Sequence, residues 1–196
     1  MSPRWPAPAP RSGSRPRSSS APSSSPSCCA CAAAVPRGDP MFYSRQTSLR
    51  LHEEHLATIQ LWGRLEQSIA ARVPEEELNA LLRNCSAALA DEVTRHFDFE
   101  EQELFTRLAR SGDGDIAELL SEEHATIRSA AASLQQLLAL PQRDAAARQQ
   151  LRALALELAE RLTAHVQKEE MALLPALEDL LDEETDRELV LAYASR

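Results

Sequence analysis

Apolar residues recur at steps of three and four positions through most of residues 49–181. This spacing places them along one face of an α-helix, so the region is predicted to be helical. Breaks in the pattern divide it into long helices over about 49–71, 74–109, 115–140 and from 144 past His165. Residues 184–196 favour a further short helix. Because short connections join long consecutive helices, the predicted fold is an all-α, antiparallel up-down-up-down four-helix bundle.

Residues suited to helix ends lie at the predicted boundaries. Pro74 suits a helix start and is followed by three glutamates, which the helix dipole favours in a first turn. Residues 111–114 include two glycines and are predicted to break the second helix. Asp115, with Glu118 three residues on, is predicted to form a capping box for the third helix. Pro175 is predicted to kink or end the fourth.

The second half of the helical region repeats the first, with an offset of 69 positions from residue 55 to residue 124. Each half has a helix with one histidine, followed by a helix that contains a histidine and a glutamate four positions later. The matching pairs are His55 with His124, His96 with His165, and Glu100 with Glu169. Two such helical hairpins are predicted to pack with pseudo-twofold symmetry.

These six residues are predicted to be metal ligands. Residues i and i+4 lie on one helix face, so each histidine–glutamate pair projects into the bundle together, and the single histidines fall at the same depth to within about one turn. Buried without partners, the ionised groups would cost several kcal/mol each, a cost that two cations would remove. Two carboxylates can bridge two ions while two histidines complete each end. This mixed donor set suits iron or manganese, and zinc less distinctly. With an oxo or hydroxo bridge, each ion would keep an open position for O₂, peroxide or NO.

Other polar residues near the predicted ligands have more than one interpretation. His52 lies three residues before His55 and could be an extra ligand, a hydrogen-bond donor behind a ligand, or a solvated residue. Glu101 and Glu170 also repeat but are rotated about 100° from the inward glutamates, which favours a solvated face. A hydrogen bond to a ligand histidine is the alternative. The glutamates that precede His55 and His124 are interpreted as surface charge, namely Glu53, Glu54, Glu122 and Glu123.

Three apolar side chains share the helix faces of the predicted ligands: Ile59, Trp62 and Ile127. We interpret them chiefly as bundle core. They are also the natural lining of an apolar pocket over the metals.

Composition separates the first 40 residues from the rest. They hold 9 of the 12 prolines, ten serines, five arginines and a single acid, and cannot form an apolar core. We interpret residues 1–40 as a disordered Pro/Ser/Arg-rich tail, or as sequence ahead of a true start at Met41. Residues 41–196 are predicted to be the folded domain.

Charge and cysteine content narrow the functional classes. Residues 41–196 contain 16 basic and 29 acidic residues, a net charge of −13, which argues against nucleic-acid binding. No apolar run of about 18 residues is present, so no membrane span is expected. Cys85 is the one cysteine of the domain and falls on an apolar helix face. We therefore expect no disulfide framework and a cytoplasmic location.

The full pattern resembles the haemerythrin HHE cation-binding domain over roughly residues 49–181. It reads His55, then His96-Phe-Asp-Phe-Glu100-Glu101, Glu122-Glu123-His124 and His165-Val-Gln-Lys-Glu169-Glu170. The resemblance implies a left-twisted four-helix bundle with a carboxylate-bridged di-iron centre that interacts with O₂ or NO, and it assigns the same six ligands.

Two positions depart from the oxygen-carrying haemerythrins. Those proteins have a fifth histidine where this chain has Arg128, and their last carboxylate is an aspartate one residue beyond Glu169. The symmetric set of four histidines and two glutamates is closer to the family's iron-repair and sensor branch, which weakens a role in stable O₂ carriage. The separate cysteine-bearing N-terminal domain usual in repair proteins is not seen here.

Three functions follow as hypotheses. The first is a di-iron protein that binds or senses O₂ or NO, or holds labile iron, through a protein partner that the sequence does not identify. The second is a di-iron enzyme acting on peroxide or NO, or a protein that repairs iron centres, although no substrate-binding motif supports it. The third is a helical interaction module whose histidines are incidental.

Overall fold

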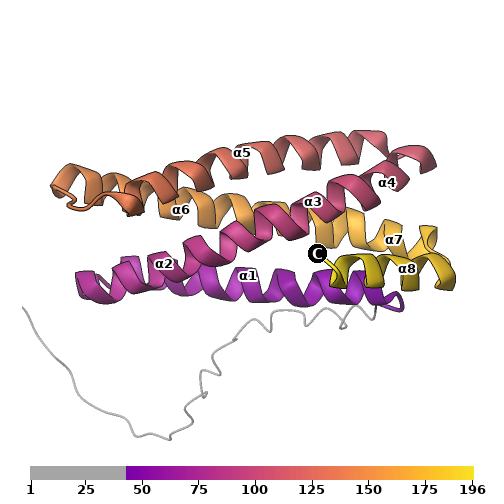
Figure 1. The fold of residues 1–196 in the computed structure, drawn as a ribbon, viewed down its shortest axis with the longest axis horizontal. Coiled ribbons are helices and arrows are strands. Elements are labelled where there is room, and N and C mark those ends of the chain that lie inside the picture. The colour runs from indigo at the N-terminus through magenta and orange to yellow at the C-terminus, as the bar shows by residue number, and fades with distance from the viewer. Residues whose placement is uncertain (1–42) are drawn as a thin grey trace, which may run out of the picture. The chain divides into compact units, whose positions relative to one another are not determined.

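The computed structural model describes residues 43–196, and the interpretation of residues 1–40 therefore lies outside the described part of the chain. Four long helical segments run along one another, and the chain reverses at each of three short connections (Figure 1). The described residues form helices and no strands, which confirms the predicted all-α class. The helical elements are α1 (Gln46–Ala70), α2 (Glu75–Asp91), η1 (Glu92–His96), α3 (Phe97–Phe99), η2 (Glu100–Leu104), α4 (Phe105–Ser111), α5 (Gly114–Ala139), α6 (Ala145–Lys168), η3 (Glu169–Leu173), α7 (Leu174–Leu180) and α8 (Glu183–Ala194).

The second and fourth long segments are continuous helices that contain π-helical turns. In the second, α2 continues through η1, α3 and η2 into α4, and in the fourth, α6 continues through η3 into α7. A π-helical turn holds one more residue than an α-helical turn, and such turns are frequent at functional sites. All three lie where the predicted ligands are.

Helix ends agree with the sequence in part. Asp144 caps α6 by accepting a hydrogen bond from the amide of Ala147, and α8 matches the predicted terminal helix. The capping box at Asp115 is wrong, because Gly112 ends α4 in the left-handed conformation (φ 115°) and α5 already begins at Gly114. Pro175 does not end the fourth helix. It is the second residue of α7, directly after the π-helical turn η3, and the helix continues to Leu180.

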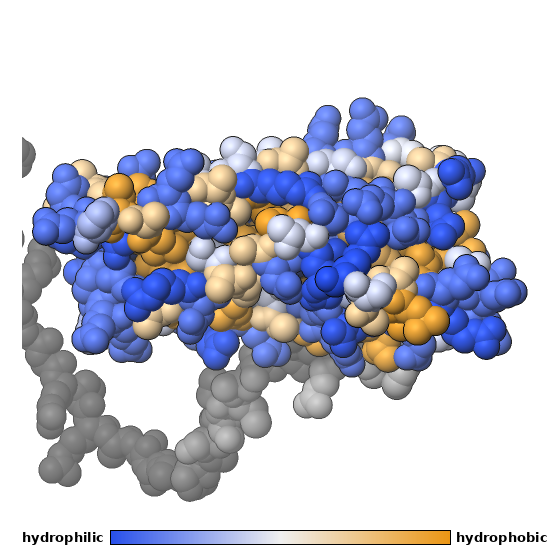
Figure 2. Space-filling view, viewed as in Figure 1, coloured by the Kyte–Doolittle hydropathy of each residue, from blue (hydrophilic) through white to orange (hydrophobic). Residues whose placement is uncertain are grey.

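The bundle core consists of two apolar clusters. One includes Trp62, Leu82, Phe97, Ile127 and Leu158, and the other includes Leu51, Phe99, Leu104, Leu120, Leu173 and Leu177. The face of the bundle seen in Figure 2 is largely hydrophilic, with apolar side chains in scattered patches. Between residues 43 and 196, every helix is too short or too polar to cross a membrane.

Candidate metal centre

Six buried side chains come together inside the bundle as two overlapping groups. One group consists of His55, His96, Glu100 and Glu169, and the other of Glu100, His124, His165 and Glu169. Within each group the ligand atoms all lie within 4.8 Å of one another. The two glutamates belong to both groups. These are the six residues that the repeat in the sequence singles out.

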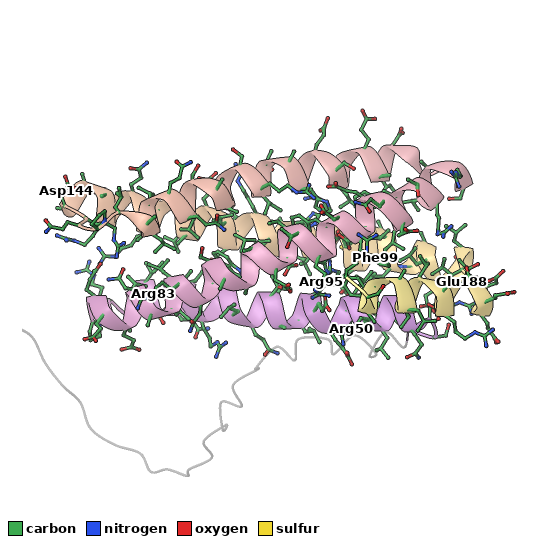
Figure 3. All side chains as sticks on the ribbon, in the orientation of Figure 1. Arg50, Arg83, Arg95, Phe99, Asp144 and Glu188 are labelled. Atoms are coloured by element: carbon green, nitrogen blue, oxygen red, sulfur yellow. The ribbon has the colours of Figure 1, made fainter. Side chains whose placement is uncertain are left out.

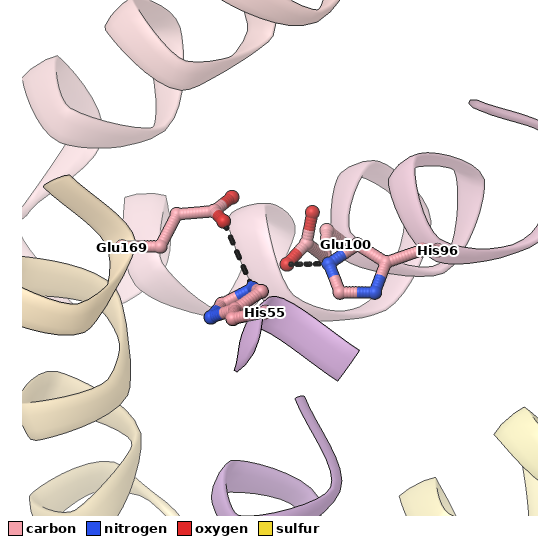
Figure 4. A group of neighbouring side chains, drawn as sticks. All are labelled: His55, His96, Glu100 and Glu169. Carbon is pink, nitrogen blue, oxygen red and sulfur yellow. Dashed lines mark ion pairs between the residues drawn. The ribbon is translucent and has the colours of Figure 1, made fainter. Parts of the chain in front are cut away.

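Each shared glutamate directs one oxygen to the histidines of the first group and the other oxygen to the histidines of the second group. In the first group, Glu169 Oε2 lies 3.1 Å from His55 Nε2, and Glu100 Oε1 lies 3.1 Å from His96 Nε2 (Figure 4). In the second, Glu169 Oε1 lies 3.0 Å from His165 Nε2, and Glu100 Oε2 lies 3.4 Å from His124 Nε2. This is the arrangement of two carboxylates that bridge two cations.

A carboxylate outside the ligand groups accepts a hydrogen bond from the Nδ1–H of every ligand histidine. The pairs are His55 with Glu170 (2.7 Å), His96 with Glu54 (3.1 Å), His124 with Glu101 (2.8 Å) and His165 with Glu123 (3.1 Å). Such a bond fixes the tautomer, so that Nε2 faces inward with its lone pair. We call these four side chains the outer carboxylates: Glu54, Glu101, Glu123 and Glu170. They follow the same 69-residue repeat as the predicted ligands.

These contacts correct two sequence interpretations. Glu101 and Glu170 are not on a merely solvated face, and Glu54 and Glu123 are not merely surface charge. On an isolated helix these side chains point away from the ligands, but in the bundle that direction leads to a histidine on another helix. The repeat of Glu101 and Glu170 was the signal that could have identified them.

Six of the eight inward-facing atoms lack partners within the described part of the chain, whereas the Nε2 atoms of His124 and His165 lie 2.9 Å from each other. Both oxygens of Glu100 and of Glu169, and the Nε2 atoms of His55 and His96, make no hydrogen bond. Once Nδ1–H is donated outward, each Nε2 lone pair faces an oxygen lone pair at close range. Buried carboxylates without donors are costly, and cations between these atoms would remove that cost. The donor set therefore fits a pair of metal ions.

The pKa values of the clustered histidines and of Glu169 also indicate that positive charge is stabilised in the centre. Burial by itself would lower the pKa of His55 and of His124, but the closely placed carboxylates of the neighbouring glutamates outweigh it and raise both values to about 9. Burial would raise the pKa of Glu169, yet the charge of His165 and the close approach of the other histidines hold it well below its ordinary value. Positive charge in the centre, whether from metal ions or from protonated histidines, therefore stabilises the two buried glutamates.

Comparison with protein families gives one match. The model of the hemerythrin HHE cation binding domain matches residues 48–177, well over half of the chain. The chain belongs to this family. A search of curated proteins found no match.

Arg128, where the resemblance to oxygen-carrying haemerythrins would lead one to expect a fifth histidine, lies beside the carboxylate that supports His124. In this haemerythrin-like domain its guanidinium bonds Glu101 (2.6 Å) and Asp98 (2.9 Å) and lies 5.5 Å from the centre of the Phe97 ring. Arg128 therefore holds Glu101, the carboxylate that accepts the hydrogen bond from His124. The departure seen in the sequence corresponds to a defined structural role.

The remaining predicted site residues lie around the centre. His52 belongs to neither ligand group; its Nδ1 lies 2.9 Å from Glu170, which is also bonded to His55. Trp62 and Ile127 are buried in the apolar core, and Ile59 is half-buried. Ile127 also lines a cleft of about 350 Å³ on the outside of the bundle.

Proposed function

We propose that this haemerythrin-like domain holds a carboxylate-bridged pair of iron ions and uses them to bind or sense O₂ or NO, or to keep iron in a labile store. His55 and His96 would hold one ion, His124 and His165 the other, and Glu100 and Glu169 would bridge them. The observation that carries the proposal is that each glutamate directs one oxygen to each histidine pair. Four imidazoles with two carboxylates suit iron or manganese, and zinc less distinctly, and the resemblance to haemerythrins favours iron.

When bound, the ions would supply redox chemistry and an open coordination position for O₂, NO or peroxide. The protein supplies orientation and a dry surrounding. The outer carboxylates hold the imidazole rings, and the two apolar clusters keep water from the centre. The up-down-up-down arrangement with pseudo-twofold symmetry and the cytoplasmic location belong to this proposal.

Metal analysis with optical spectroscopy tests the proposal. We expect close to two irons per chain and oxo-bridged ferric absorption in the oxidised protein. Both should be lost in Glu100→Ala and in the double variant His96→Ala/His165→Ala. Glu122→Gln is a matched control, because Glu122 is exposed and directly precedes an outer carboxylate and a ligand in the sequence. Iron content that is unchanged in the ligand variants would refute the assignment.

Ligand binding separates the proposed function from an enzyme. Stoichiometric spectral changes with O₂ or NO support binding or sensing. Steady turnover of peroxide or NO that disappears in Glu100→Ala would favour the enzyme hypothesis instead.

A further inference from the structure

Both tyrosines of the 196-residue chain bond the outer carboxylates of one histidine pair. The Tyr43 hydroxyl donates to Glu170 Oε2 (2.9 Å), and Glu170 Oε1 lies 2.7 Å from His55 Nδ1. The Tyr193 hydroxyl donates to Glu54 Oε2, which lies 3.1 Å from His96 Nδ1. Two tyrosine–glutamate–histidine chains therefore lead to the same metal position.

The other histidine pair has cations in the corresponding places. Lys168 Nζ lies 2.6 Å from Glu123, and Arg128 lies 2.6 Å from Glu101. A lysine or an arginine thus satisfies these outer carboxylates without a tyrosine. In the half with the tyrosines, Glu54 also bonds Arg50 (3.0 Å) and Arg95 (3.3 Å). Because a lysine or an arginine can hold an outer carboxylate equally well, we infer that the two tyrosines have a function besides this support.

The surroundings of Tyr193 suit a redox-active phenol. Its side chain is 5 % exposed, and its hydroxyl lies 3.4 Å from His96 Nδ1. Its ring packs 4.6 Å from that of Phe99 and 4.7 Å from the Arg95 guanidinium, both of which Figure 3 shows beside α8. Tyr193 also lines a groove of about 550 Å³ between α1 and α8, through which an external reductant can approach.

We propose that Tyr43 and Tyr193 each donate one electron to reactions of the metal centre with peroxide and release the phenol proton to the glutamate that they bond. This inference rests on the proposed di-iron centre. Reduction of hydrogen peroxide to two waters takes two electrons and two protons. A centre with one ferrous and one ferric ion holds a single available electron, and the tyrosine supplies the second. Its O–H bond breaks, the proton passes to the glutamate that it already bonds, and a tyrosyl radical remains. Both protons taken up by the peroxide come from solvent.

Electron paramagnetic resonance of the iron-loaded chain tests the inference. The protein is brought to the state with one ferrous and one ferric ion, titrated with hydrogen peroxide, frozen during the reaction, and compared with protein grown on ring-deuterated tyrosine. We expect a narrow radical signal whose hyperfine structure collapses on deuteration. The signal should fall by more than half in Tyr193→Phe and vanish in Tyr43→Phe/Tyr193→Phe, while iron content and ferric absorption stay as in the parent protein. Met171→Leu removes an oxidisable side chain that is exposed on the surface, and it should leave the signal intact.

The outcomes separate this inference from the proposed function. Iron-replete protein with normal ferric absorption but no radical would overturn the tyrosine role alone. A radical that persists in the double variant would do the same. A chain that binds no iron would overturn the di-iron proposal and this inference with it.

Discussion

Glu123 and Glu122 are adjacent in the sequence but differ in their contacts, which allows a controlled test of the outer carboxylates. Glu123 Oε2 accepts the Nδ1–H of His165 at 3.1 Å, and its other oxygen lies 2.6 Å from Lys168 Nζ. Glu122 is exposed. Replacing each in turn by glutamine removes one negative charge from the same turn of α5. Only Glu123→Gln weakens the support of a predicted ligand.

The expected loss can be estimated from the contact. Substitution of such a partner typically lowers metal affinity about 10- to 100-fold. Because a quarter of the Glu123 side chain is exposed and glutamine can still accept the hydrogen bond, we expect the lower end, about tenfold or about 1.4 kcal/mol. By linkage the loaded domain should lose that stability, which corresponds to about 3–6 °C in Tm for a domain of this size.

The assay compares both variants and the parent with and without metal. Competition with a chelator measures affinity, and thermal unfolding followed by circular dichroism measures stability. Glu123→Gln should lose affinity and loaded-state Tm, while Glu122→Gln should match the parent. Equal affinities for the two variants would refute the reasoning. A fall in Tm of the same size with and without metal would show that Glu123 acts only through the fold.

Three further predictions concern the fold without metal. Since the pKa values of His55 and His124 are raised to about 9 from an unfolded value of 6.5, their contribution to stability is fully present below pH 6.5 and lost as the pH rises through about 9. Urea unfolding of the metal-free domain at pH 6 and at pH 9.5 checks this, and equal stability at both would contradict it. Leu158→Ala empties a fully buried position and should cost about 2–5 kcal/mol in the same assay, so a loss below about 1 kcal/mol would argue against the packing. Asp186→Ala removes the acceptor for two amides at the start of α1 and should cost about 0.5–2 kcal/mol, with faster amide exchange confined to that turn.

The six side chains that converge in the bundle were predictable from the sequence because two regularities coincide in them. Helical spacing places His96 with Glu100, and His165 with Glu169, on inward faces. The 69-residue offset then marks the single histidines as their partners. Neither regularity depends on how far apart the helices lie.

The outer carboxylates were misjudged for a physical reason. Helical rotation tells which way Glu101 points from its own axis, but not what stands there. In the bundle the neighbouring helix brings His124 within 2.8 Å, so a side chain that leaves one helix face meets another helix rather than water. The π-helical turns were not predicted either, because shifting main-chain hydrogen bonds by one residue has no fixed residue signature.

The start of α1 is another feature that depends on contacts between distant parts of the chain rather than on the local sequence pattern. The apolar pattern predicts a helix from about residue 49, and the structure begins it at Gln46. The additional turn is stabilised from the far end of the chain, where Asp186 accepts hydrogen bonds from the amides of Gln46 and Thr47 and Glu178 accepts one from that of Arg45.

The sequence by itself determined the helices, their inward faces and the six converging side chains, because these depend on local periodicity. The tertiary structure decided which carboxylate supports which histidine and where α1 begins, because those contacts join residues on different helices whose separation no local pattern encodes.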